Sequence, residues 1–322
     1  MSADDDDDDG TDRERTSDDD DDDAGNVAIT RKKEEIQVEF DFEAPDEIDF
    51  QGLKSLLTPY LDGTEWQVGT LCDAIIGQFW CGNVVKPEDS LDPVAIVTAL
   101  NLRFFRSVQP CASLEDIYHF LRRHTSDSTI RKSLEDMFHE DDSRIALLLN
   151  DRLINVPGEV SAPLYALLLS EMTKGSQDDE LTAEGRKAMQ NEGFLLVTRV
   201  WVEDSDDHEG GKAPRGHTAL GRGGDGGGGG KEAAGSALKK HPAVTGLRAP
   251  PVHEGSLPFS CLRPEDEFLW RRCTWAFAFA EANRVQKRGE PRAVRLAMLV
   301  SRGALEGAAE ELYQNYGRPE MD

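Results

Sequence analysis

A glycine-rich tract comes nearest to a nucleotide-binding motif. Residues 221–226 match the spacing GxGxxG, in which glycines let the backbone approach a diphosphate. The motif needs a strand directly before it and a helix directly after it, but the preceding predicted strand ends near Val202 and polar sequence follows. A Walker A loop fails as well, because Asp225 replaces its first glycine and Glu232 replaces the magnesium-binding Ser or Thr. The tract therefore predicts a flexible insertion.

Metal ligands and nucleophiles occur without the spacing that their chemistry requires. His119 and His124 are five apart in one predicted helix, so they do not share a face, and the sequence contains no HExxH or GxSxG. Cys72 and Cys81 are separated by eight residues, which fits no zinc framework. The five cysteines include no CxxC and indicate idle thiols in a reducing compartment. We expect no catalytic residue, no metal and no cofactor.

Two polar runs contain residue types that could take part in catalysis. The stretch RPEDE, Arg263–Glu267, offers three adjacent carboxylates that could include an acid pair, but we expect a solvated entrance to the strand predicted after it. In LLLNDRLINVPGEVSAPLY, a buried strand ends in Asn150, Asp151 and Arg152, and the chain then turns into a helix. From the residues alone, this second run predicts a strand-to-helix connection whose polar groups satisfy the local backbone.

Hydrophobic periodicity predicts the elements that would position these residues. Apolar residues alternate at 36–42, and 94–102 is apolar on both faces, as expected of a central strand paired in a hairpin with 81–86. Ser113 and Asp116 predict a capping box. Strands are expected at 34–43, 81–86, 94–102, 144–155, 193–203, 265–280 and 292–301, and helices at 49–61, 66–79, 113–124, 129–138, 160–172 and 304–316.

The order of these elements predicts an α+β (mixed α/β) fold with one mixed sheet flanked by helices. We divide the chain into a disordered acidic tail at 1–33, the first part of the domain at 34–203, a flexible glycine-rich insertion at 204–260 and the last part of the domain at 261–318. No run of about 18 apolar residues occurs, so we expect no membrane span.

The net charge of −26 points to the kind of partner. Residues 4–23 hold fourteen acidic residues and two arginines, and we expect the remaining −14 to be spread over the rest of the chain. Such a chain repels nucleic acid and attracts basic proteins, although a tail that only maintains solubility is the alternative. The partner-binding candidates are Asp4, Asp5, Asp6, Asp7, Asp8, Asp9, Asp18, Asp19, Asp20, Asp21, Asp22 and Asp23.

Several stretches in this order resemble the BCCIP family of animals, fungi and plants. They are VEFDFEAPDEIDFQGLKSLL, VVKPED, VTALNL, LLLNDRLINVPGEVSAPLY, FLLVTRVWV and EDEFLW. The family signature is carried by Asn150, Asp151, Arg152, Asn155 and Pro157. This chain departs from the family pattern at Gly158, which is usually a second proline, in the short PEDSLDP segment, in the insertion, and between 275 and 291.

The resemblance implies a fold similar to that of GNAT acetyltransferases, without an established activity, and the chain lacks the pyrophosphate loop of those enzymes. It also implies a nuclear protein that shuttles to the cytoplasm and acts as a chaperone or adaptor for a basic ribosomal protein of the large subunit. A scaffold for DNA-repair, recombination and cell-cycle proteins is the alternative, and an acyl-CoA-dependent acyltransferase is a further one. Direct nucleic-acid binding is not expected.

Overall fold

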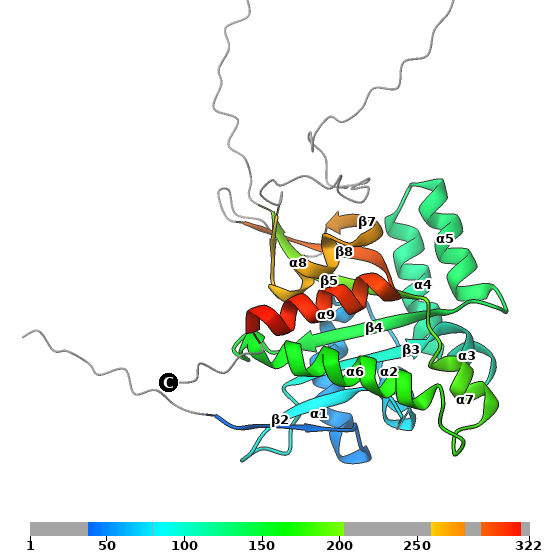
Figure 1. Ribbon diagram of the computed structural model, residues 1–322. Helices are drawn as coiled ribbons and strands as arrows, with labels where there is room; N and C mark the ends of the chain where they lie inside the picture. Colours follow the sequence, from blue (N-terminus) through cyan, green and yellow to red (C-terminus); the bar gives the residue numbers. More distant parts are fainter. Residues whose placement is uncertain (1–37, 79, 203–258, 281–290, 317–322) are drawn as a thin grey trace, which may run out of the picture. The chain divides into compact units, whose positions relative to one another are not determined.

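The computed structural model describes residues 38–78, 80–202, 259–280 and 291–316. The predicted acidic tail, both aspartate runs and nearly all of the predicted insertion lie outside these residues. Within them, eight strands form one mixed sheet in the order β1-β2-β3-β4-β5-β8-β7, with the short β6 paired to β5 (Figure 1). This confirms the predicted α+β class with a mixed sheet flanked by helices.

The first three strands form an antiparallel meander. They are β1 (Phe40–Glu43), β2 (Asn83–Pro87) and β3 (Ala95–Asn101). The predicted hairpin joins β2 to β3, and β3 is buried along its whole length, as expected of a central strand. In β1 the alternation of sides holds from Phe40 onward, with Asp41 and Glu43 exposed.

The remaining strands centre on one parallel pair. β4 (Ile145–Arg152) is antiparallel to β3 and parallel to β5 (Gly193–Val202). β5 pairs with β8 (Arg292–Ser301) over its full length, and β8 pairs with the edge strand β7 (Cys273–Ala280). β6 is Ser260–Cys261. Segments far apart in the chain thus meet around β5.

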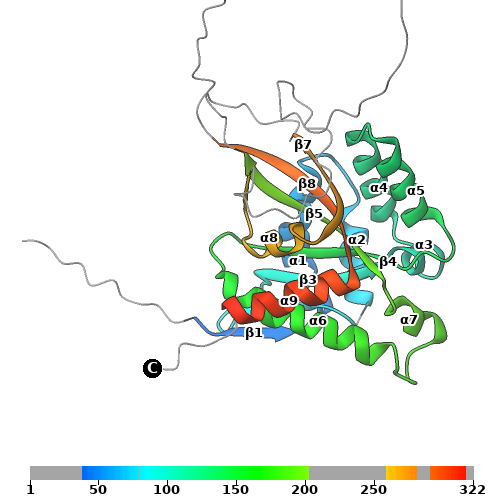
Figure 2. The same ribbon diagram turned by 45° about the horizontal axis from the view of Figure 1, so that its top comes forward.

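Helices cover both faces of the sheet. α6 (Ser161–Gly175) and α9 (Arg302–Tyr316) lie side by side on one face, and α8 (Glu265–Trp270) packs against α9 (Figures 1 and 2). The other face carries α1 (Phe50–Leu57), α2 (Val68–Gly77), α4 (Ala112–His124) and α5 (Ser128–His139). The shorter helices are η1 (Glu47–Asp49), η2 (Thr58–Leu61), α3 (Leu102–Ser107), η3 (Gly158–Val160) and α7 (Ala183–Ala188).

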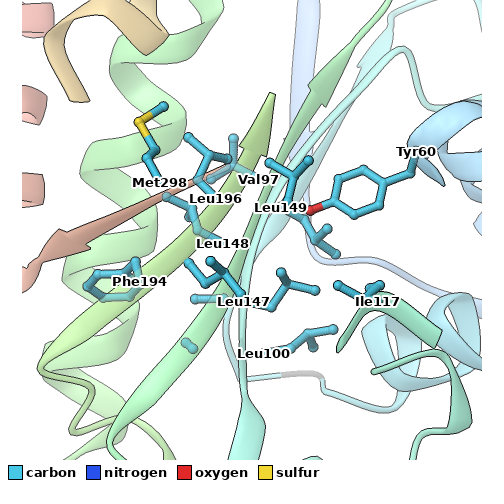
Figure 3. Close-up of a cluster of buried hydrophobic side chains, with 14 of the residues drawn as sticks. Tyr60, Val97, Leu100, Ile117, Leu147, Leu148, Leu149, Phe194, Leu196 and Met298 are labelled. Carbon is cyan, nitrogen blue, oxygen red and sulfur yellow. The ribbon is translucent and has the colours of Figure 1, made fainter. Parts of the chain in front are cut away.

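The core lies on both sides of β4, because successive side chains of a strand point to opposite faces. Figure 3 shows Leu148 beside Phe194, Leu196 and Met298, whereas Leu149 faces Tyr60 on the other side. These side chains are almost completely buried. The two faces of the sheet therefore have separate apolar layers that share the same strand.

Two local predictions were wrong for physical reasons. The predicted capping box of α4 does not form, because Ser113 and Asp116 bond instead to Gln67, the residue before α2. The Asp116 carboxylate accepts from the Gln67 backbone N–H at 3.0 Å, and the Ser113 hydroxyl donates to the Gln67 carbonyl. The long strand predicted at 265–280 begins as helix α8, and only its second half is β7. Tertiary contacts override local pattern in both cases.

Candidate functional site

Two segments distant in sequence meet where β4 ends. The Arg152 guanidinium donates to both carboxylate oxygens of Glu265 on α8, with Nε–Oε1 and Nη2–Oε2 distances of 3.0 and 3.1 Å. Both side chains are nearly buried, and Arg152 also donates from Nη1 to the Val156 carbonyl at 2.5 Å. A two-point pair of this kind fixes direction as well as distance. It ties the chain after β4 to α8.

The parallel pair β4–β5 opens at the same place. Its residue pairing ends at Leu148 and Leu196, although both strands continue. Two residues further on, the carboxylate of Asp266 joins the strands. One of its oxygens accepts from Asn150 Nδ2 of β4 at 3.1 Å, and the other accepts from the Thr198 hydroxyl of β5. A side chain of α8 thus replaces the missing backbone pairing.

Arg263 completes the closure of this opening. Its Nε donates to Asp266 at 3.2 Å, its Nη2 to Thr198 Oγ1 at 3.0 Å and its Nη1 to Asp151 Oδ1 at 2.7 Å. By strand alternation, Thr198 belongs to the sheet face of Leu196, and Asp151 belongs to the opposite face. The guanidinium therefore reaches across the opening and contacts groups from both faces of the sheet.

The cluster holds two guanidinium groups and three carboxylates with little solvent. We call it the β4–α8 ion cluster: Asp151, Arg152, Arg263, Glu265 and Asp266. Burial alone would lower the pKa of Arg263, but Asp151, Asp266 and Glu265 outweigh burial and raise it. Burial raises the pKa of Asp266, and Arg263 opposes that shift. Each charge thus depends on its partners, as buried ions in proteins generally do.

Burial, together with the neighbouring acidic groups, raises the pKa of two nearby side chains. Burial, followed by the charges of Asp266 and Glu265, raises the pKa of the Tyr165 hydroxyl. Burial and the nearby acids Asp266, Glu267 and Glu265 likewise raise the pKa of the Cys261 thiol. Neither group is an activated nucleophile at neutral pH, since reactivity needs the ionised form.

The structure brings together part of the predicted signature. Asn150, Asp151 and Arg152 all bond to the α8 segment, whereas Asn155 and Pro157 are exposed in the loop that follows. The interpretation of Arg263–Glu267 as a solvated strand entrance was wrong, because Glu265 and Asp266 are almost completely buried. The sequence analysis did not predict the pairing between the end of β4 and the α8 segment. The available signal was the presence of two basic and three acidic residues in otherwise apolar segments.

The negative charge of the described residues is concentrated in one region, whereas we expected it to be spread over the rest of the chain. Residues 38–101 contain twelve acidic residues and two basic ones, and residues 1–101 together carry −21 of the net −26. Of the two bases, Lys86 is nearly buried between Glu43 and Asp49, with Nζ–O distances of 2.9 and 2.8 Å. Lys54 on α1 is exposed. The β1–β3 region is therefore strongly acidic on its surface.

The part of the chain that the structure describes lacks two further features. No group of three or more His, Cys, Asp or Glu side chains there is arranged to hold a metal ion. Among the helices of the same residues, none is both long and apolar enough to cross a bilayer.

The fold and the ion cluster together define an α+β protein with one mixed sheet. In this sheet, buried ion pairs fill the opening between the parallel strands β4 and β5. The chain belongs to the BCCIP family, because the model of that family, described as BCCIP, matches residues 35–269. That range includes all five residues of the β4–α8 ion cluster.

Individual relatives cover less of the chain. It is 33% identical over 171 residues to the Protein BCCIP homolog of Arabidopsis thaliana, which covers 52% of this chain and 51% of that one. It is 33% identical over 172 residues to Protein bcp1 of Schizosaccharomyces pombe, covering 52% of this chain and 58% of the relative. The chain thus spans only about half the length of these curated relatives.

The fold also matches a solved structure. The crystal structure of BCP1 from Saccharomyces cerevisiae superposes with a TM-score of 0.51, at 20% sequence identity, over 89% of this chain and 93% of that one. This likeness supports the fold alone. The predicted similarity to GNAT acetyltransferases stays a prediction.

Proposed function

We propose that this protein is a non-enzymatic chaperone or adaptor that binds basic client proteins. The observation that carries the proposal is the concentration of −21 charges in the first 101 residues. A surface of one sign attracts partners of the opposite sign and repels nucleic-acid phosphates. The expected client is a basic ribosomal protein of the large subunit, which the chain would shield from RNA during ribosome assembly and nuclear transport.

The filled opening between β4 and β5 supports a binding role over an acyl-transfer role. In the described structure Asp266 and Arg263 occupy that opening and use their polar atoms to join the two strands. A ligand that entered between the strands would have to displace buried ion pairs, which costs several kcal/mol. A thermal-shift titration with acetyl-CoA tests this point, and a saturable rise in melting temperature would contradict it.

The acidic tail is expected to act on the rate of association. At about 0.15 M salt, charges are screened over about 8 Å, so attraction by the tail should weaken steeply as salt rises. Deleting residues 1–25 should slow binding to a purified basic ribosomal protein at low salt in stopped-flow measurements. A second variant keeps the length of the tail but replaces the twelve aspartates of the two runs by asparagine. It should slow binding equally. An unchanged association rate in both variants would remove the tail from the mechanism.

The expected location is the nucleus, with shuttling to the cytoplasm. This follows from the proposed client, which has to travel between these compartments. Imaging of a fluorescent fusion before and after inhibition of nuclear export would test it.

A further inference from the structure

Exposed apolar side chains gather at one end of the sheet. Of the eight large apolar side chains that are exposed in the described part of the chain, five lie where β1 begins, on η1, where the β2–β3 hairpin turns and just after β4 ends. We call them the hairpin-end surface: Val38, Ile48, Leu91, Leu153 and Ile154, which are 51%, 56%, 72%, 45% and 81% exposed. The remaining three are Val108, Leu167 and Tyr313.

Backbone contacts bring the three segments together. The Leu153 N–H donates to the Val94 carbonyl at 2.9 Å, so the loop after β4 lies beside the hairpin. The Glu88 N–H donates to the Glu39 carbonyl at 3.1 Å, which places the start of β1 next to the same hairpin. In Figures 1 and 2 the start of β1 and the connection from β4 to α6 lie on the same side.

Helix η1 joins the same end of the sheet. The residue after Ile48 is Asp49, whose carboxylate is 2.8 Å from the Lys86 ammonium at the end of β2. On α1, Gly52 lies against Pro93 of the hairpin so closely that an added Cβ would come within 2.4 Å of the Pro93 ring. The hairpin is therefore packed onto α1, the helix that directly follows η1 and its exposed Ile48.

The loop that carries Leu153 and Ile154 is held in place. Arg152 joins Glu265 on one side of the loop and the Val156 carbonyl on the other. The Val156 side chain is buried, and the backbone N–H of Val156 donates to the Leu153 carbonyl at 3.0 Å. These hydrogen bonds thus hold Ile154 out toward solvent at the tip of a tight turn. Exposed apolar side chains that gather in one place, unlike those scattered singly, are typical of an interaction surface.

Acidic residues surround these apolar side chains. The exposed acids on the same segments include Glu39, Glu47, Glu88, Asp89 and Asp92. No lysine or arginine occurs at 38–53, 87–101 or 153–160. A complementary partner must therefore combine apolar side chains with positive charge. A second copy of this chain would place acid against acid, which opposes association.

We propose that the hairpin-end surface docks an amphipathic basic segment of a protein partner, with apolar side chains against Leu91 and Ile154 and lysines or arginines against the surrounding acids. This inference rests on the proposed function and names the surface that performs it. The apolar contacts supply the part of the affinity that salt does not remove, and the acids supply orientation and specificity. The β4–α8 ion cluster acts indirectly, by holding the loop.

The test uses full-length protein and an 18-residue fluorescent peptide with leucines on one helical face and lysines on the other. Fluorescence polarisation at 0.15 M salt should show saturable binding. The double variant L91S/I154S should weaken binding about tenfold or more, since both apolar contacts are lost. The matched control V108S/L167S removes two exposed apolar side chains elsewhere and should change the Kd less than twofold. A peptide with glutamates in place of lysines should not bind.

The outcomes separate the two proposals. If the full chain binds a purified basic ribosomal protein but L91S/I154S binds both probes as tightly as the unchanged chain, the docking surface is refuted and the proposed function stands. If the unchanged chain binds no basic protein, the proposed function fails. If mass photometry shows a dimer that L91S/I154S disperses, the occupant is a second copy, and the proposal is overturned.

Discussion

Arg152 and Glu265 are 113 residues apart in the chain and form a buried two-point ion pair. The pair joins the last residue of β4 to the first residue of α8. Because Arg152 also bonds to the Val156 carbonyl, it connects the buried cluster to the exposed turn at Leu153 and Ile154. A substitution in the buried β4–α8 ion cluster can therefore change the conformation of the exposed turn at Leu153 and Ile154.

The first prediction concerns Arg263. Replacing it by methionine leaves Asp266 and Asp151 without their shared cation, so we expect a loss of about 3–5 kcal/mol in the free energy of unfolding. Urea denaturation measures this. As a control, Arg271→Ala removes a half-exposed pair between the residue that follows α8 and Glu267 of that helix, and should cost at most about 1 kcal/mol. Equal losses in both variants would mean that the cluster does not stabilise the fold.

The second prediction concerns the coupling of Arg152 to the turn. In Arg152→Ala we expect faster hydrogen exchange at the amides of Leu153 and Val156, because the side chain that fixes the turn is gone. A double-mutant cycle with Glu265→Ala should give a favourable interaction free energy of about 1–3 kcal/mol between the two residues. Exchange rates that match those of the unchanged chain would show that the turn is held by its backbone alone.

The third prediction concerns the contact between α1 and the hairpin. Gly52→Ala should destabilise the protein by about 1–3 kcal/mol, because the added methyl group overlaps Pro93. Gly303 of α9 has no neighbour within 4 Å of an added Cβ, so Gly303→Ala is the matched control and should stabilise by about 0.5–1 kcal/mol. Thermal melts of both variants measure these changes. An unchanged melting temperature in Gly52→Ala would mean that Pro93 and the hairpin move aside at little energetic cost.

The fourth prediction concerns pH and the thiols. Burial raises the pKa of Cys72 to about 11 and that of Cys273 to about 12. A raised pKa leaves little thiolate at pH 8, so the folded protein should react with Ellman's reagent far more slowly than the guanidinium-unfolded protein. The rate in the folded protein should increase with pH above 8. Rapid reaction of all five thiols at pH 8 without denaturant would contradict this assignment.

The sequence predicted most elements because their signals are local. The periodicity around Leu53 and Leu57 indicated α1, and the continuous apolar run through Ile96 and Leu100 indicated a central strand. It did not predict α3, α7 or α8, which have six residues each. Helices of six residues have too few turns to show a period, and the apolar residues of α3 and α8 also suit a strand.

The candidate site was predictable only in part. The run Asn150–Arg152 stood out as polar sequence at the end of a buried strand, and its segment carried the family resemblance. Nothing in the local sequence showed that Arg263, Glu265 and Asp266 would be its partners. Their acidic and basic types suit a solvated surface equally well, and only burial against β4 and β5 turns them into a cluster.

By itself, the sequence determined the charge of this protein, its α+β class and its family, because composition, periodicity and the ordered stretches that resemble the family are properties of the chain. The tertiary structure alone decided where the β4–β5 opening lies, that Asp266 and Arg263 fill it, and that Ile154 projects beside the hairpin. Such long-range pairings depend on the mutual burial of segments about 60 to 116 residues apart, and no local pattern encodes the place where two segments meet.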